Sequence, residues 1–132
     1  MADLLIVEEW LAEAEEDFRF ASVSLAEHDE FFSRICFHFQ QAAEKYLKAF
    51  IVARGLEFKK IHNLRVLLNI CKKEDMGFGE LQEECLFLNA FYVDTRYPAF
   101  WPVGRTREEA QKAQEAVKAI GDFVKEKLRD KI

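Results

Sequence analysis

The sequence predicts an all-α protein, an antiparallel up-and-down helical bundle of four to five helices. Apolar residues recur at alternating spacings of three and four, which is the period of an amphipathic helix. No segment shows the apolar and polar alternation of a strand. The helices are expected in the order long, long, short, medium and long with brief connections, and this order is typical of such a bundle.

The first helix is expected over residues 3 to 27. Its apolar positions are Leu4, Val7, Leu11, Ala14, Phe18, Ala21 and Leu25. The other face is acidic and carries Glu8, Glu9, Glu13, Glu15 and Glu16. The sequence His28-Asp29-Glu30 interrupts the apolar pattern and separates this helix from the next.

The second and third helices are expected over residues 31 to 53 and from residue 64. Gly55 suits the left-handed position that follows a helix C-terminus. The apolar positions of the short third helix are Leu64, Leu67, Leu68 and Cys71. Gly77 and Gly79 mark the next connection.

The fourth helix is marked by Leu81, Cys85, Leu88 and Tyr92. It should stop near Thr95, because Pro98 and Pro102 oppose continuation. Thr106 and Glu109 have the spacing of a capping box for the fifth helix. Its apolar positions are Ala110, Ala113, Val117, Ile120, Val124 and Leu128. Gly121 within it costs roughly 1 kcal/mol relative to alanine unless a neighbouring backbone needs the space.

Length and composition indicate a single domain over residues 1–132 with a substantial core. Half of the residues are hydrophobic and 13 are Phe, which argues against disorder. No apolar run approaches the roughly 20 residues that span a bilayer, and the N-terminus is acidic where a signal peptide is basic. We therefore expect a cytoplasmic protein without membrane association. Cys36, Cys71 and Cys85 are expected as buried thiols, and neither a metal nor a cofactor is expected.

Charge is segregated along the chain. Residues 1 to 30 hold ten carboxylates and only Arg19 as a cation, whereas residues 45 to 73 hold eight Lys and Arg and only Glu57 as an anion. The acidic first segment argues against broad duplex binding, and the basic segment has the charge to receive a phosphate, a short RNA or an acidic surface. Alternatively, the two segments attract each other or are solvated faces.

A narrow polar stripe follows the second helix. At about 100° per residue it spans roughly 80° and holds Arg34, His38, Gln41, Lys45 and Lys48. Apolar residues cover roughly 200° of the remaining circumference, as in the central helix of a bundle. The neighbouring cations favour neutral His38, which suits a hydrogen-bonding role or a base. A purely structural histidine is the alternative.

The segment from Asp94 to Gly104 combines one guanidinium with three aromatic side chains. Arg96 suits a phosphate, and Tyr97, Phe100 or Trp101 suit base stacking worth about 1 to 3 kcal/mol per base. The alternatives are that the aromatic residues close the end of the bundle or contact a partner. The predicted ligand-binding residues are Arg34, His38, Gln41, Lys45, Lys48, Arg96, Tyr97 and Trp101.

Three sequence motifs together resemble the HEPN family of small helical domains. They are the helix from Cys36 to Phe50 with its Gln-Gln-Ala-Ala-Glu-Lys core, His62-Asn63-Leu64, and the run from Tyr92 to Pro98. The resemblance spans about residues 2 to 128. It implies nucleotide binding, association with separate minimal nucleotidyltransferases and, in some branches, metal-independent RNase activity.

The nuclease branch of that family carries Arg followed by four to six residues and then His. Here Arg34 and His38 have three residues between them, Arg54 and His62 have seven, and no histidine follows Arg96. The resemblance therefore implies no RNase site of the usual kind. Nucleotidyl transfer would need a separate catalytic domain with a Gly-Ser motif and paired acids, which this chain lacks.

These observations lead to the hypothesis of a non-catalytic homodimeric module that binds a nucleotide or substrate and acts with a separate nucleotidyltransferase, as in a toxin–antitoxin pair. The homodimer is expected because, in a chain this small, the first and fifth helices cannot cover all of the apolar second helix. One alternative is an RNase toxin with a displaced site that uses His38 with Arg34 or Arg96. The other is a structural adaptor.

Overall fold

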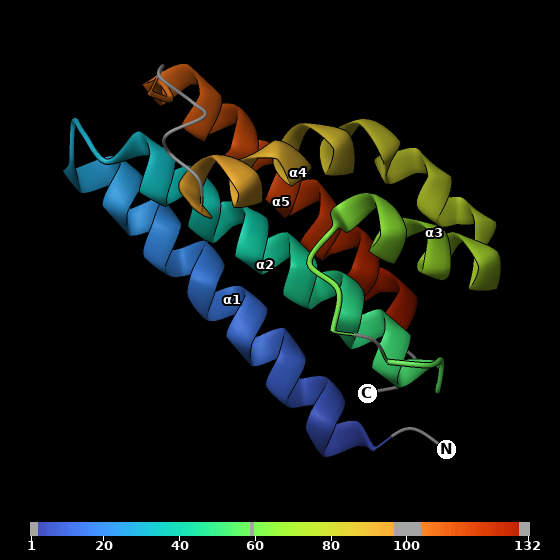
Figure 1. Cartoon of the computed structure of the whole chain (residues 1–132). Helices are drawn as coiled ribbons and strands as arrows, with labels where there is room; N and C mark the ends of the chain where they lie inside the picture. The colour runs from blue at the N-terminus through green and yellow to red at the C-terminus, as the bar shows by residue number, and fades with distance from the viewer. Residues whose placement is uncertain (1–2, 59, 97–103, 130–132) are drawn as a thin grey trace.

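The computed structural model describes residues 3–58, 60–96 and 104–129, and every regular element among them is helical. Figure 1 shows the elements in chain order. They are α1 (Leu4–Glu27), α2 (Phe32–Ala53), α3 (Leu64–Glu74), the 3-10 helix η1 (Met76–Leu81), α4 (Gln82–Arg96) and α5 (Arg107–Leu128). The predicted all-α up-and-down bundle is confirmed.

Local hydrogen bonds explain where the helices begin and end. The Asn63 side chain accepts hydrogen bonds from two backbone N–H groups at the start of α3. Thr106 and Glu109 form the predicted capping box at the start of α5, each side chain accepting a hydrogen bond from the backbone N–H of the other residue. Gly55 follows α2 with φ of 66°, the left-handed conformation expected there.

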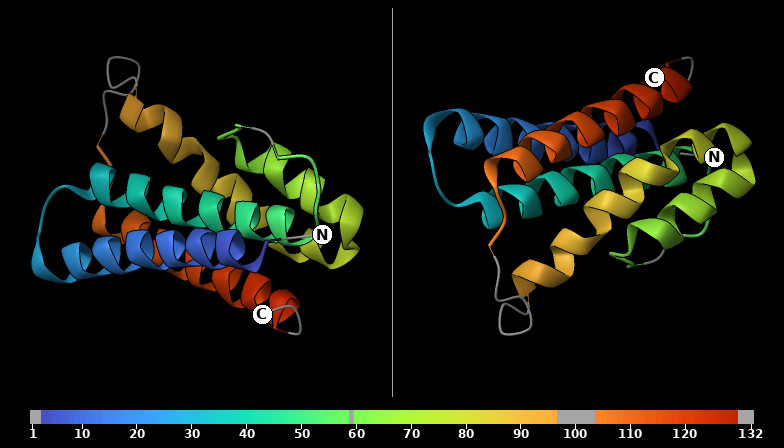
Figure 2. Two further views of the ribbon diagram at one scale, coloured as in Figure 1. Left: turned by 90° about the horizontal axis from the view of Figure 1, so that it is seen from below. Right: turned by 90° about the horizontal axis from the view of Figure 1, so that it is seen from above.

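Helix α2 lies at the centre of the bundle. Figure 2 shows α1 and α5 on one side of it and α3 and α4 on the other. The expectation that α2 would keep uncovered apolar surface within one chain was wrong, because α3 and α4 cover what α1 and α5 leave. The buried apolar residues of α2 are Ile35, Cys36, Phe39, Ala42, Ala43, Tyr46, Leu47, Ala49, Phe50 and Ile51. A dimer contact would therefore use another surface.

Gly121 allows α5 to approach α2 closely. A Cβ at this position would lie 2.8 Å from Cζ of Tyr46, well inside van der Waals contact. The Tyr46 hydroxyl donates a 2.8 Å hydrogen bond to Oε2 of Glu15 on α1. The neighbour that leaves no room for a side chain at residue 121 is therefore an aromatic ring. The sequence had suggested a neighbouring backbone instead.

The three cysteines are buried and unpaired, as expected. Burial raises the pKa of each thiol to about 12. Among the residues that the structure describes, no group of three His, Cys, Asp or Glu side chains could hold a metal ion. No helix in the described part of the chain is long and apolar enough to cross a membrane.

Candidate functional site

A buried carboxylate on α2 is the centre of a polar network. Oε2 of Glu44 accepts a 2.8 Å hydrogen bond from the ammonium of Lys48 and lies 2.9 Å from Nδ1 of His62. The Glu44 and Lys48 side chains are 5% and 6% exposed. A buried charged group is costly without a partner, and here each of the two side chains is the partner of the other.

The same network joins α2 to the start of α3 and to α4. Gln40 donates a 3.2 Å hydrogen bond to the carbonyl oxygen of His62. Asn89 on α4 accepts a 2.8 Å hydrogen bond from the backbone N–H of Leu64 and donates a 3.2 Å bond to Oδ1 of Asn63. The motif residues that carry the family resemblance therefore connect three helices.

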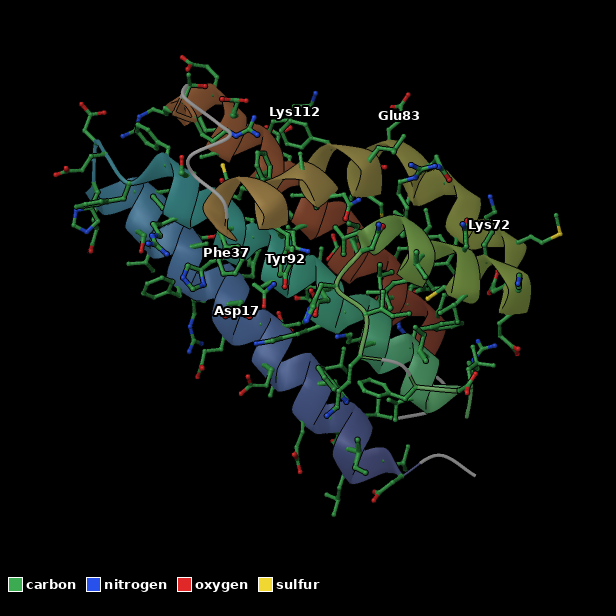
Figure 3. All side chains as sticks on the ribbon, viewed as in Figure 1. Asp17, Phe37, Lys72, Glu83, Tyr92 and Lys112 are labelled. Carbon is green, nitrogen blue, oxygen red and sulfur yellow. The ribbon has the colours of Figure 1, made fainter. Side chains whose placement is uncertain are left out.

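Three rings next to this network form what we call the aromatic platform: His62, Tyr92 and Phe37. The His62 and Tyr92 rings are stacked, with centroids 5.0 Å apart and planes 14° apart. Tyr92 is stacked on Phe37 at 6.1 Å and 29°. Figure 3 shows Phe37 and Tyr92 together beside α2. The His62 side chain is 49% exposed, so the platform reaches the surface.

Lys45 and Lys48, two of the predicted ligand-binding residues, are already paired within the chain. The Lys45 ammonium lies 2.7 Å from Oδ2 of Asp17 and 3.2 Å from Oε1 of Glu13, both on α1. Burial alone would lower the pKa of Lys45, but these carboxylates raise it above its usual value. Lys48 is held by Glu44 and is only 4% exposed. The alternative that the acidic and basic segments attract each other therefore holds for Lys45.

His38 lies half-buried between aromatic side chains. Its ring meets those of Phe20 and Phe37 edge-on, at centroid distances of 4.9 and 5.6 Å. Its Nδ1 lies 4.0 Å from Oδ1 of Asp17. Burial lowers the pKa of His38 below its usual value, opposed by Asp17 and assisted by Lys45 and Arg34. The ring is therefore neutral at pH 7.

The remaining predicted residues are Arg34 and Gln41 on α2, Arg96 at the end of α4, and two residues outside the described chain. Arg34 is exposed near that end, and Gln41 is half-buried with its amide donating to Gln40. Helix α4 runs antiparallel to α2, so its last residue, Arg96, lies toward Arg34 and away from Lys48. The side chain of Arg96, and with it the predicted phosphate contact, falls outside what the structure describes. Tyr97 and Trp101 fall outside the described residues.

Sequence reasoning did not select Glu44, His62, Tyr92 or Phe37 for this site. One signal was available, since Glu44 falls only about 40° from Lys48 on the helical wheel and precedes it by four residues. The stacking of His62 on Tyr92 had no comparable signal. Those residues are 30 positions apart and meet only through the packing of α4.

The family model of the HEPN domain matches residues 7–127 of this chain. The chain therefore belongs to the HEPN domain family, and the resemblance drawn from its motifs is confirmed. A crystal structure of an archaeal HEPN homologue is similar in fold, with a TM-score of 0.74 and 24% sequence identity. The similarity covers 92% of this chain and 97% of that one. No curated protein sequence matches the chain.

Proposed function

We propose that this chain is a non-catalytic HEPN module that binds a nucleotide, or a similar phosphorylated aromatic substrate, on behalf of a separate nucleotidyltransferase. The pair would be of the toxin–antitoxin type and cytoplasmic, which suits a chain whose cysteines are all unpaired thiols. The aromatic platform beside the C-terminal end of α4 is the observation that carries the proposal.

The platform and the exposed Arg34 together offer both components that such a ligand needs. Stacking of a base on an aromatic ring is worth about 1 to 3 kcal/mol, and His62 is accessible at the surface. Arg34 is exposed on α2, and the backbone of Arg96 is placed one helical turn after Tyr92. The guanidinium of Arg34, together with Arg96 as the sequence predicts, would supply a phosphate site. Lys45 and Lys48 take no part in the proposal, because carboxylates already neutralise them.

The proposed absence of catalysis rests on the pairing of the polar groups. Nδ1 of His62 is occupied by Glu44, and Lys48 is buried against the same carboxylate. The Arg and His spacing of the nuclease branch does not occur in the sequence. A binding role requires none of these groups to change its protonation state.

We further propose that the module is a homodimer and that the contact involves the turn between α1 and α2. Phe20, Val23 and Phe31 are large apolar side chains that are 56%, 49% and 56% exposed. Phe31 also has φ of 67°, a left-handed conformation that is unfavourable for a bulky residue. Burial of these side chains against a second copy would remove their exposure to water.

Isothermal titration with ATP, GTP and short RNA oligonucleotides tests the ligand. Binding should weaken by about tenfold in Tyr92→Leu and in Arg34→Ala, as expected for loss of one stacking or charge-assisted contact. Lys73→Ala, at the far end of α3, is the matched control and should bind normally. Unchanged affinity in both Tyr92→Leu and Arg34→Ala would exclude this site, and absence of binding to every ligand would favour a structural adaptor.

Light scattering tests the dimer separately. The native chain should have twice the monomer mass at micromolar concentration, and Phe20→Ser with Phe31→Ser should be monomeric. The conservative double variant Phe20→Leu with Phe31→Leu should remain dimeric. A native monomer would contradict this part of the proposal without affecting the ligand site.

An RNase with a displaced site is the second candidate, and one observation favours it. His38 is neutral at pH 7 and its Nδ1 faces Asp17, an arrangement that a general base could use. Incubation of the purified protein with labelled single-stranded RNA decides between the candidates. Cleavage that is lost in His38→Ala would establish the RNase, whereas intact RNA supports the binding module.

A further inference from the structure

A groove of about 630 Å³ lies between α4 and α5, away from the aromatic platform. Its apolar part consists of Leu86 and Phe87 on α4 and Ala116 on α5. Leu86 is 47% exposed, which is unusual for a leucine in the middle of a helix of this bundle. At 100° per residue, Phe87 lies roughly 140° around α4 from Tyr92, so the two sites use different faces of one helix.

The groove is acidic at its edges. Glu83, Glu84 and Glu115 line it, and Lys112 is the single cation among the described lining residues. Oε1 of Glu84 is buried and receives no hydrogen bond from any described group. Figure 3 shows Glu83 and Lys112 at the same edge of the molecule. Three carboxylates against one ammonium leave a formal charge of −2 around an apolar floor.

Lys112 lies over an aromatic ring of the groove. Its ammonium lies 4.4 Å from the centroid of the Phe87 ring, in cation–π contact, while the surrounding glutamates supply negative charge. An incoming lysine or arginine would meet the same carboxylates, those of Glu83, Glu84 and Glu115. An aliphatic residue on the same segment would cover Leu86 and Ala116.

We propose that this groove docks a basic amphipathic helix of a protein partner, with an apolar stripe flanked by lysine or arginine. The charge complementarity of the groove selects a basic segment over an acidic one. A helix in a groove anchored by residues one turn apart is a recurrent mode of recognition. The proposal does not depend on nucleotide binding, because no residue of the aromatic platform lines the groove.

The test uses the native chain and two synthetic amphipathic peptides of about four helical turns. One carries leucines flanked by lysines, and the other has the same leucines flanked by glutamates. Backbone NMR shifts should change on addition of the lysine peptide and centre on Leu86, Phe87 and Ala116. The glutamate peptide should bind at least about tenfold more weakly, because its charges oppose those of the groove.

Charge variants of the chain identify the site. Glu84→Gln with Glu115→Gln should weaken the lysine peptide by about fivefold or more. The control is Glu8→Gln with Glu9→Gln, on the exposed acidic face of α1. It removes the same number of negative charges and should have little effect on the affinity for the lysine peptide. Failure of the lysine peptide to bind, shifts centred on α1, or equal binding of both peptides would overturn the proposal. Shifts at Leu86 that depend on protein concentration without peptide would instead show self-association and overturn it too.

Discussion

Gly121 on α5 packs directly against the ring of Tyr46 on α2. A Cβ at residue 121 would lie 2.8 Å from Cζ and 2.9 Å from Cε2 of that ring. Tyr46 is only 3% exposed and is held by its hydrogen bond to Glu15, so the ring has little freedom to move. The contact determines how closely the two helices approach.

Gly121→Ala should therefore destabilise the protein by about 1 to 2 kcal/mol, measured by urea denaturation. Alanine favours a helix by about 1 kcal/mol over glycine, but the overpacking against Tyr46 costs more. In a Tyr46→Leu background the same substitution should become neutral or stabilising. A destabilisation of equal size in both backgrounds would show that the ring is not the cause.

Removal of the Glu44 carboxylate should be the most damaging single change in the polar network. Glu44→Ala leaves the Lys48 ammonium, with a side chain 6% exposed, without its partner. Loss of one member of a buried ion pair costs about 3 to 5 kcal/mol.

The double variant Glu44→Leu with Lys48→Met is the control for this change and should recover most of the loss, because no buried charge remains. Thermal and urea denaturation would measure both variants. A cost below about 1 kcal/mol for Glu44→Ala would mean that water reaches Lys48.

Folding stability should depend on the protonation of His38. Its pKa is lowered in the folded protein from a usual value of 6.5, chiefly by burial, so the unfolded chain binds more protons in this range. Stability is then complete above about pH 6.5 and falls as pH decreases toward the lower folded-state pKa.

Urea denaturation at a series of pH values measures the effect of His38. In His38→Gln the decrease should be absent, whereas His28→Gln, at an exposed position, should retain it. Asp75 and Glu109, whose carboxyl pKa values are lowered, contribute stability that is lost only in a more acidic range. A profile unchanged by His38→Gln would assign the dependence to another group.

The capping box of α5 offers a local test. Thr106→Ala removes the side chain that accepts a hydrogen bond from the backbone N–H of Glu109. The expected loss is about 1 kcal/mol, and Thr106→Ser should keep nearly all of the stability because it preserves the hydroxyl. Equal losses in the two variants would point to packing of the threonine methyl group instead.

The helices could be predicted from the sequence because their signals are local. Apolar spacing placed α1 and α2 within one residue of their observed starts, and Thr106 and Gly55 marked a helix start and a helix end through their own hydrogen bonding and conformation. These features depend on residues a few positions apart. No knowledge of the neighbouring helices was needed.

The candidate site could be predicted only in part, because it depends on which helix faces which. Lys48 belongs to a polar stripe in the sequence, yet Glu44 and the aromatic rings of Trp10 and Phe58 enclose its ammonium. The stacking of His62 on Tyr92 requires the antiparallel packing of α4 on α2. A single helical wheel contains no information about either arrangement.

The burial of Cys36, Cys71 and Cys85 has a practical consequence for all of these experiments. Thiol reagents react with the thiolate form of cysteine. At neutral pH a thiol with a pKa of about 12 is almost entirely protonated, so very little thiolate is present. The three thiols are also buried away from solvent. A cysteine introduced at an exposed position such as Leu86 would therefore be the one reactive thiol in the folded chain, and it could carry a dye, a spin label or a cross-linker. Site-specific labelling could then proceed with the three native cysteines in place.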